Sequence, residues 1–406
     1  MLGSPARPTD RLIDAAPVTL PGPDGSSLPR RLHIALIAPP YFEIPPRSYG
    51  GIEAMMADLA DALVAAGHTV TLLAAGRPGT AADFIPLWAE PIPERLGQPL
   101  PEIAHTLKVR RTIEDLIVAP TGSAVDIVHD HTLAGPINAA AFRQLGVPTV
   151  VTVHGFVGAD VGEFYRDLGD DVGLVAISDR QRELFPDLNW TGRVHNAIRP
   201  TDWPFRAAKD VYALFLARFN PDKGGHLALE AAHTSGVPLV LACKCVEPLE
   251  AAYFRDTVLP MLGDRDYVFG EADSVSKREL LARARCLVLP LQWEEPFGMV
   301  MIEAMACGTP VVTLNRGAAR EIVVDGLTGF ICDHPADLPA AIKRAGELDP
   351  YACRRHVELN FNSATMALGY ERIYRQLLHP KARQPNRFTV HPVQPAAESG
   401  RSAISA

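Results

Sequence analysis

The chain has 406 residues, 47% of them hydrophobic, and a formal net charge of −8 from 39 basic and 47 acidic residues. This length suits two ordinary domains better than one, and the absence of a dense basic cluster argues against nucleic acid as a partner. The sequence shows no run of 18 apolar residues and no basic segment followed by an apolar stretch, so we expect a soluble cytoplasmic protein without a membrane span.

In the N-terminal half, short apolar runs with strand character alternate with segments of helical period, which is typical of βαβ units on a parallel sheet. Residues 1–30, before this pattern, and 379–406, at the other end, are expected to be disordered because they cannot bury enough apolar area. The expected strands are 31–38, 68–76, 126–130, 148–155 and 173–178, with a helix at 52–67.

Ligands of doubly wound folds bind beyond the carboxyl ends of the strands, so the residues there are the first candidates for a site. The pair Gly50-Gly51 opens the first helix, where a backbone without side chains can approach another molecule closely. His154 ends the strand 148–155. His129 and His131 lie on one side of another strand end, but no third ligand with suitable spacing follows, and we expect no metal there.

The C-terminal half repeats the pattern after an interruption at 193–205, so two doubly wound α/β domains are expected. A turn after its first strand carries Arg218 and Lys223, which are either anion ligands or plain surface cations. Asp264 and Asp266 form a D-x-D pattern, which is too common for us to expect a metal. The expected strands are 212–219, 238–244, 266–270, 286–291, 310–314 and 329–333, with helices at 224–236 and 276–284.

The stretch EEPFGMVMIEAMACGTPVV, residues 294–312, places two carboxylates around an apolar run. We expect a helix from Pro296, ended by Gly308, so that Glu295 and Glu303 lie at most about 12 Å apart along its axis. Carboxylates accept hydrogen bonds from sugar and ribose hydroxyls, while a helix N-terminus holds phosphate oxygens. Two acids in this arrangement would bracket a nucleotide sugar, although the alternative is one loop acid and one exposed helical acid.

The same stretch closely resembles the E-x7-E signature of the family 4 glycosyltransferases, and the segment GAAREIVVDGLTGFI resembles the part of that family that follows it. Weaker similarity extends over most of residues 31–378. The resemblance implies the retaining GT-B architecture, with two Rossmann-like domains facing across a cleft. It implies an acceptor domain at 31–200, a donor domain at 201–362, and a final helix at 363–378 that crosses back to the N-terminal domain.

The resemblance also implies roles for the residues of the E-x7-E stretch. Glu295 would face the hydroxyls of the donor sugar, and Glu303 would bind the ribose hydroxyls. The backbone around Phe297, Gly298 and Met299 would hold sugar and diphosphate oxygens.

The remaining roles lie in other loops. Arg218 and Lys223 match the family's two diphosphate ligands, and two fixed cations would neutralise the leaving group without a metal or other cofactor. Gly50 and Gly51 would lie near the donor phosphates and the acceptor, and His154 would point at the donor sugar.

Two stretches depart from the family pattern: Ala217 stands where glycine is usual, and the segment 241–248 (LACKCVEP) stands where a glycine-rich loop is common. Both affect the geometry expected around the diphosphate. Ser178 and Asn196 lie in segments that resemble interdomain contacts of the family, and they are weaker candidates.

We therefore expect a retaining transferase that moves a hexose from a nucleotide diphosphate sugar, with UDP-glucose favoured and GDP-mannose second, to an acceptor hydroxyl. A nucleotide-sugar epimerase and a non-catalytic nucleotide-sugar-binding protein are the alternatives. The acceptor is unknown. The apolar character of 77–110 suggests a small-molecule or amphiphilic one.

Overall fold

The computed structural model describes residues 30–46, 50–118, 124–245 and 247–379, and from Leu32 onward these residues form one compact unit. The predicted tails lie outside this description except for Arg30 and His379. The N-terminal sheet has seven strands, all parallel. In spatial order they are β3 (Asp83–Trp88), β2 (Thr69–Ala75), β1 (His33–Ile37), β4 (Ile127–Asp130), β5 (Thr149–Val153), β6 (Val172–Ala176) and β7 (Trp190–Arg193).

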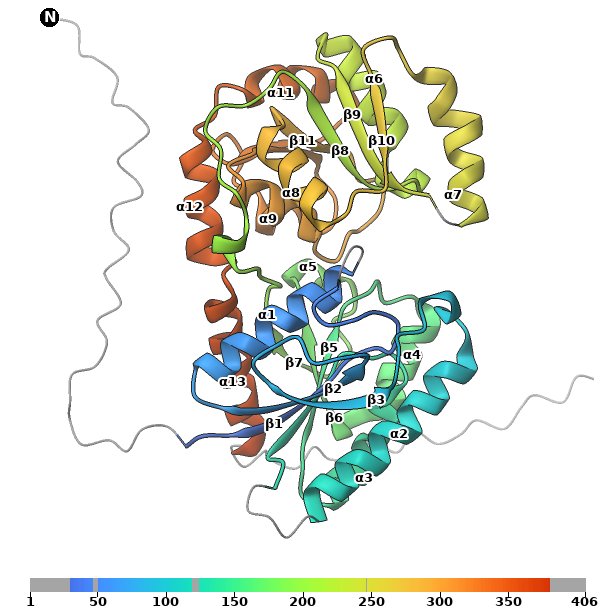
Figure 1. The fold of residues 1–406 in the computed structure, drawn as a ribbon, viewed down its shortest axis with the longest axis vertical. Helices are drawn as coiled ribbons and strands as arrows, with labels where there is room; N and C mark the ends of the chain where they lie inside the picture. The colour runs from blue at the N-terminus through green and yellow to red at the C-terminus, as the bar shows by residue number, and fades with distance from the viewer. Residues whose placement is uncertain (1–29, 47–49, 119–123, 246, 380–406) are drawn as a thin grey trace, which may run out of the picture. The chain divides into compact units, whose positions relative to one another are not determined.

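Helices cover both faces of this sheet, with α1 and α13 on one face and α2, α3 and α4 on the other (Figure 1). The sheet is buried on both sides, which explains why its central strands read as continuous apolar runs. These helices and α5, together with the sheet, form what we call the N-terminal lobe. Their bounds are α1 (Gly51–Ala65), α2 (Pro99–Val118), α3 (Ala139–Gln144), α4 (Ala159–Leu168), α5 (Asp179–Leu184) and α13 (Ser363–Leu378).

The last helix, α13, completes the core of the N-terminal lobe although it follows the whole second sheet in the chain. Tyr370 and Tyr374 on this helix are fully buried. The Tyr374 hydroxyl shares a hydrogen bond of 2.8 Å with His129 Nδ1, and the Tyr370 hydroxyl shares one of 2.9 Å with Thr152 Oγ1. The predicted crossing helix is thereby confirmed.

The C-terminal sheet has six parallel strands. In spatial order they are β10 (Tyr267–Gly270), β9 (Leu239–Lys244), β8 (Ala213–Arg218), β11 (Cys286–Leu289), β12 (Val311–Leu314) and β13 (Gly329–Cys332). The helices of this C-terminal lobe are α6 (Gly225–Ser235), α7 (Pro248–Tyr253), α8 (Ser274–Arg283), α9 (Met299–Ala306), α10 (Ala319–Ile322), α11 (Leu338–Ala345) and α12 (Pro350–Asn360).

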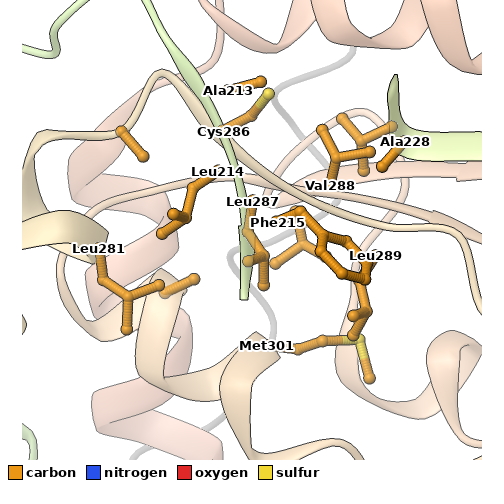
Figure 2. Packing of buried hydrophobic residues seen from close by; sticks show 14 of the residues in the cluster. Ala213, Leu214, Phe215, Ala228, Leu281, Cys286, Leu287, Val288, Leu289 and Met301 are labelled. Atoms are coloured by element: carbon orange, nitrogen blue, oxygen red, sulfur yellow. The ribbon is translucent and has the colours of Figure 1, made fainter. Parts of the chain in front are cut away.

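The core of the C-terminal lobe lies between this sheet and its helices. Figure 2 shows Phe215 of β8 and Leu289 of β11 meeting Met301 of α9, all of them fully buried or nearly so. In both sheets the strand order reverses beside the first strand of the lobe, between β1 and β4 and between β8 and β11. These are the switch points at which doubly wound folds bind ligands, and the expected fold class is confirmed.

The helix that was expected to begin at Pro296 begins instead at Met299 and spans only eight residues. Gly298, with a φ of 92°, occupies the N-cap in a left-handed conformation that ends the preceding loop. Glu295 therefore lies in a loop and only Glu303 lies on α9, so the expected spacing along one helix axis was wrong. Gly308 follows the helix as predicted, with a φ of 77°.

The chain passes between the lobes twice, and the two crossings pair with each other. Ile198 donates its N–H to Phe361 O at 3.0 Å, and its carbonyl accepts the N–H of Ser363 at 3.0 Å. A search of the described residues finds no helix with the length and apolar character needed to cross a membrane.

Candidate functional site

A cavity of about 430 Å³ lies between the two lobes, at the carboxyl ends of β1 and β8. Gly50 and Gly51 line it from the start of α1. Arg218, Met299 and Glu303 line it from the C-terminal lobe. Five of the predicted site residues therefore share one cavity.

The Glu303 carboxylate is 4% exposed and has a cationic partner within the cavity wall. Lys277 of α8 donates a hydrogen bond to it at 2.8 Å. The Lys277 ammonium also lies 5.1 Å from the centre of the Trp203 ring, and the Arg278 guanidinium lies 5.4 Å from that ring. The sequence reasoning missed Lys277, although a buried carboxylate requires such a partner.

Arg218 ends β8 and points its guanidinium at two carboxylates of the same lobe. Its Nε donates to Glu250, which is 2% exposed, and its Nη2 donates to Glu247. Glu247 caps α7, and Glu250 returns the capping interaction from the third position of that helix. Glu247 belongs to the segment 241–248 that departs from the family pattern, and Glu250 follows it, so this part of the chain places negative charge on the predicted diphosphate ligand.

Lys223 and Glu295 form a second charged group beside the cavity. The Lys223 ammonium donates to the Glu295 carboxylate and lies 4.6 Å from the centre of the Trp293 ring. Trp293 Nε1 donates to the same carboxylate at 3.1 Å. Lys223 is positioned by the turn that ends at Gly224, whose φ is 74° and where a Cβ would lie 2.1 Å from Pro290 O. This turn requires glycine.

The loop that carries Glu295 is held from behind by a second glycine. Gly317 has a φ of 52°, and a Cβ on it would lie 2.2 Å from Glu295 O. The N–H of Ala318 donates to the same carbonyl at 3.0 Å. Phe297, further along the loop, is 2% exposed and packs against His195 with ring centres 5.7 Å apart. The side chain of Phe297 thus anchors this loop.

His154 follows β5 and shares a hydrogen bond of 2.8 Å between its Nε2 and His131 Nδ1. Burial lowers the pKa of His154 to about 3 and holds the pKa of His131 well below its ordinary value, so both rings are neutral at physiological pH. His129 bonds instead to Tyr374 and Thr152. Among the described residues no group of three or more His, Cys, Asp or Glu side chains is arranged to hold a metal ion.

The start of α1 brings the N-terminal lobe against the C-terminal lobe. A Cβ on Gly51 would lie 3.8 Å from Met299 Cγ, and a Cβ on Gly50 would lie 2.8 Å from Pro46 Cβ. Glu53, in the first turn of this helix, is 5% exposed, and burial raises its pKa to about 7.

The weaker candidates Asp266 and Ser178 hydrogen-bond to backbone groups of their own lobes, and Asn196 is buried. Asp266 accepts from Gly263 N at 2.9 Å and from Leu239 N at 3.1 Å, and it lies 2.5 Å from His233 Nε2. Ser178 caps α5, and Asn196 is 5% exposed.

The structure thus forms one cavity and one adjoining charged group from the predicted residues. Among the described residues, those that line the cavity do not include His154, Lys223 or Glu295. Lys223 and Glu295 meet each other, whereas His154 meets His131 in the N-terminal lobe.

Two family models match the chain. The model described as glycosyl transferases group 1 matches residues 203–355, and the model described as glycosyltransferase family 4 matches residues 49–172. Each match lies within one of the two lobes, and residues of both matched regions line the cavity.

Two relatives illustrate the similarity. YtcC, a putative glycosyltransferase of Bacillus subtilis (strain 168), is 30% identical over 263 residues, which are 59% of this chain and 62% of that protein. The alpha-maltose-1-phosphate synthase of Mycobacterium tuberculosis is 29% identical over 341 residues, which are 73% of this chain and 84% of that protein.

Solved structures share the same fold. AviGT4, a glycosyltransferase involved in avilamycin A biosynthesis, superposes with a TM-score of 0.64 at 26% identity, over 86% of this chain and 98% of its own. HepE of Anabaena, solved in complex with UDP and glucose, superposes with a TM-score of 0.65 at 16% identity, over 85% and 100% of the two chains. The second likeness concerns the fold alone.

Proposed function

Because the chain belongs to the family 4 glycosyltransferases of the GT-B architecture, we propose that it transfers a hexose from a nucleotide diphosphate sugar to an acceptor hydroxyl with retention of the anomeric configuration. The observation that carries this proposal is the cavity that Glu303, Arg218 and the start of α1 line together. In this proposal residues 31–200 bind the acceptor, and residues 201–362 bind the donor.

The donor occupies the cavity with its ribose at Glu303. Carboxylate oxygens accept hydrogen bonds from the two ribose hydroxyls. Lys277 donates a hydrogen bond to Glu303 at 2.8 Å and orients its carboxylate, so the acid is prepared to accept such bonds. The diphosphate extends toward Arg218 and the N–H groups of α1 at Gly51.

The charged groups beside the cavity support the chemistry of transfer. Arg218 and Lys223 neutralise the diphosphate as it leaves, because fixed cations stabilise charge that develops in the transition state. Glu295 and His154 orient the sugar, and the neutral state of His154 suits it to hydrogen bonding rather than charge pairing. Lys223 donates to the Glu295 carboxylate, so in this proposal donor binding exchanges part of this pair for phosphate and sugar contacts.

We propose UDP-glucose as the first donor and GDP-mannose as the second. Support comes from the fold of HepE, which was solved with UDP and glucose. In this proposal Arg218 and Lys223 supply the positive charge at the diphosphate, and no metal ion takes part.

We propose an amphiphilic or small aromatic acceptor. Three apolar side chains are exposed in the segments that follow β4 and β5, at the carboxyl ends of the strands, where ligands bind in such folds. Leu133 is 53% exposed, Ile137 61% and Phe156 47%. Leu100 and Ile103 on α2 are also more than half exposed. Such side chains favour contact with apolar surface.

Thermal unfolding with a panel of UDP-, GDP- and ADP-sugars, in EDTA and in magnesium, tests the donor site. A cognate donor at about one hundred times its Kd stabilises the folded state by about 2.7 kcal/mol. We expect the Glu303→Gln and Lys223→Met variants to lose this stabilisation. The Glu347→Gln variant, which removes an exposed carboxylate away from the cavity, should retain it.

Product analysis then tests the reaction. Release of nucleoside diphosphate that depends on an added acceptor, with an α-linked product from an α-linked donor, is the expected result. Conversion of the donor to an epimer without acceptor would identify the epimerase alternative. If no nucleotide sugar stabilises the protein, the proposed donor site is wrong.

A further inference from the structure

The short helix α5 contacts both loops to which we assign the sugar. It is built on the N-terminal lobe, where Ser178 Oγ accepts the N–H of Gln181 at 3.1 Å and starts the helix. Its other side lines a small pocket of about 10 Å³ together with Glu294, Glu295 and Pro296 of the C-terminal lobe.

On the N-terminal side, Gln181 holds the backbone on both sides of His154. Its amide nitrogen donates to Val153 O at 2.9 Å and to Gly155 O at 2.8 Å. Its amide oxygen accepts the N–H of Ile177 at 3.0 Å, and the residue is 3% exposed. With these polar atoms satisfied and buried, the amide fixes the peptides that carry His154.

On the C-terminal side, Arg180 contacts Glu294, the residue before Glu295. Arg180 Nε donates to Glu294 Oε2 at 2.8 Å, and the same oxygen accepts the N–H of Gly317 at 3.1 Å. Gly317 is the residue packed against the Glu295 carbonyl. Arg180 therefore ties the turn behind Glu295 to the other lobe.

A third contact joins the same two segments. Glu321 of α10 accepts the N–H of Asp179 at 2.7 Å and that of Arg180 at 2.8 Å, one with each carboxylate oxygen. His195 Nε2 lies 2.9 Å from Glu321 as well. Burial raises the pKa of Glu321, but the hydrogen bonds from His195 and from the two N–H groups outweigh it and hold this pKa below its ordinary value.

We propose that Arg180 is a positioning residue that fixes the Glu295 loop relative to His154 only while the two lobes are in contact. The inference rests on the proposed function, since it concerns the residues to which we assign the donor sugar. α5 connects the two segments, because Gln181 holds the backbone around His154 and Arg180 holds the Glu295 loop through Glu294. Transfer then depends on an interlobe contact that touches neither donor nor acceptor.

Hydrogen exchange on the ligand-free protein tests the structural half of the inference. In the Arg180→Ala variant, amides of residues 293–300 and 316–322 should exchange roughly two to five times faster, which corresponds to loss of a partly exposed ion pair. Arg182→Ala is the matched control, because Arg182 lies on the same helix in an exposed pair with Asp179. Equal exchange in the two variants would overturn the inference.

Steady-state kinetics test the functional half. We expect Arg180→Ala to lower kcat roughly tenfold, with a smaller change in the KM for donor, because misplaced reacting groups affect the transition state most. Glu294→Gln should have a similar effect, and the double variant should lose little more than either single variant, since both remove one contact. Arg180→Lys should restore part of the activity, while Arg182→Ala should match the wild type.

The two proposals fail in different ways. If the wild type transfers no sugar, the proposed function fails, whereas the exchange experiment still decides whether Arg180 holds the loop. If the wild type is active and Arg180→Ala retains its kcat, the positioning role is wrong and the proposed function stands. Thermal unfolding of each variant identifies one that has lost its fold, and Arg180→Lys then provides the comparison.

Discussion

Replacing Glu53 by glutamine is expected to stabilise the protein at pH 8 and to leave its stability nearly unchanged near pH 4.5. Glu53 lies in the first turn of α1 and is 5% exposed. Burial raises its pKa from the ordinary 4.5 to about 7, against the lowering effect of its own backbone N–H. The folded state therefore holds a proton that the unfolded chain releases at lower pH.

The sign of the effect follows from this order of pKa values. Between pH 4.5 and about 7 the folded state binds more protons than the unfolded state, so stability falls as pH rises through this window. The difference between the two pKa values corresponds to about 3 kcal/mol once both states are ionised, at about 1.36 kcal/mol per pH unit. A neutral glutamine of similar shape removes the free-energy cost of ionising a buried carboxylate.

Urea unfolding at pH 5 and pH 8 measures the effect. We expect Glu53→Gln to gain up to about 3 kcal/mol at pH 8 and less than about 1 kcal/mol at pH 5. Glu163→Gln, which replaces an exposed glutamate on α4, serves as the control and should change neither value appreciably. An equal gain at both pH values, or a loss at pH 8, would refute the reasoning.

Two further predictions concern the glycine behind the donor-sugar loop and the crossing helix. Gly317→Ala should abolish stabilisation by donor, because its Cβ would displace the backbone of the Glu295 loop. Gly326→Ala, also at positive φ but with open space around it, should keep that stabilisation. Thermal unfolding with donor measures both. Tyr374→Phe should lower the free energy of unfolding by about 1–3 kcal/mol, since it leaves buried His129 Nδ1 without its partner. Tyr351→Phe, at an exposed tyrosine, should have little effect in the same urea titration.

The fold was predictable because its strands are buried on both faces. The apolar runs at 33–37 and 286–289 are continuous, and such runs between helical segments indicate a parallel sheet. β3 and β7 were not predicted. They are edge strands and only partly buried. A proline interrupts the apolar residues 84–88 of the first, and the second has one large apolar residue, Trp190, before a glycine.

The start of α9 shows where a local rule was misleading. Proline is favoured in the first turn of a helix, so the sequence predicts a helix that begins at Pro296. The structure uses Gly298 as the N-cap because its left-handed conformation lets the Glu295 loop fold back against Gly317. That contact joins residues far apart in the sequence, and no local pattern reports it.

The partners of the predicted site residues were the least predictable part. Lys277 lies 26 positions before Glu303, and Glu250 lies 32 positions after Arg218. Glu250 reaches Arg218 because β8 and β9 are neighbouring strands, whereas Lys277 reaches Glu303 because α8 packs against α9. A buried carboxylate indicates that some cation must be near it, but only the packing of α8 against α9 identifies that cation as Lys277.

The position of α13 has a consequence for the synthesis of the chain on the ribosome. The N-terminal sheet and α1 are made first, yet Tyr370 and Tyr374, which complete their core, are among the last described residues to be made. Until then, the residues of β4 and β5 that bond to these tyrosines lack the partners that they have in the folded protein. The newly made N-terminal lobe therefore exposes apolar surface until the C-terminal lobe and α13 have been synthesised. Chaperones bind exposed surface of this kind.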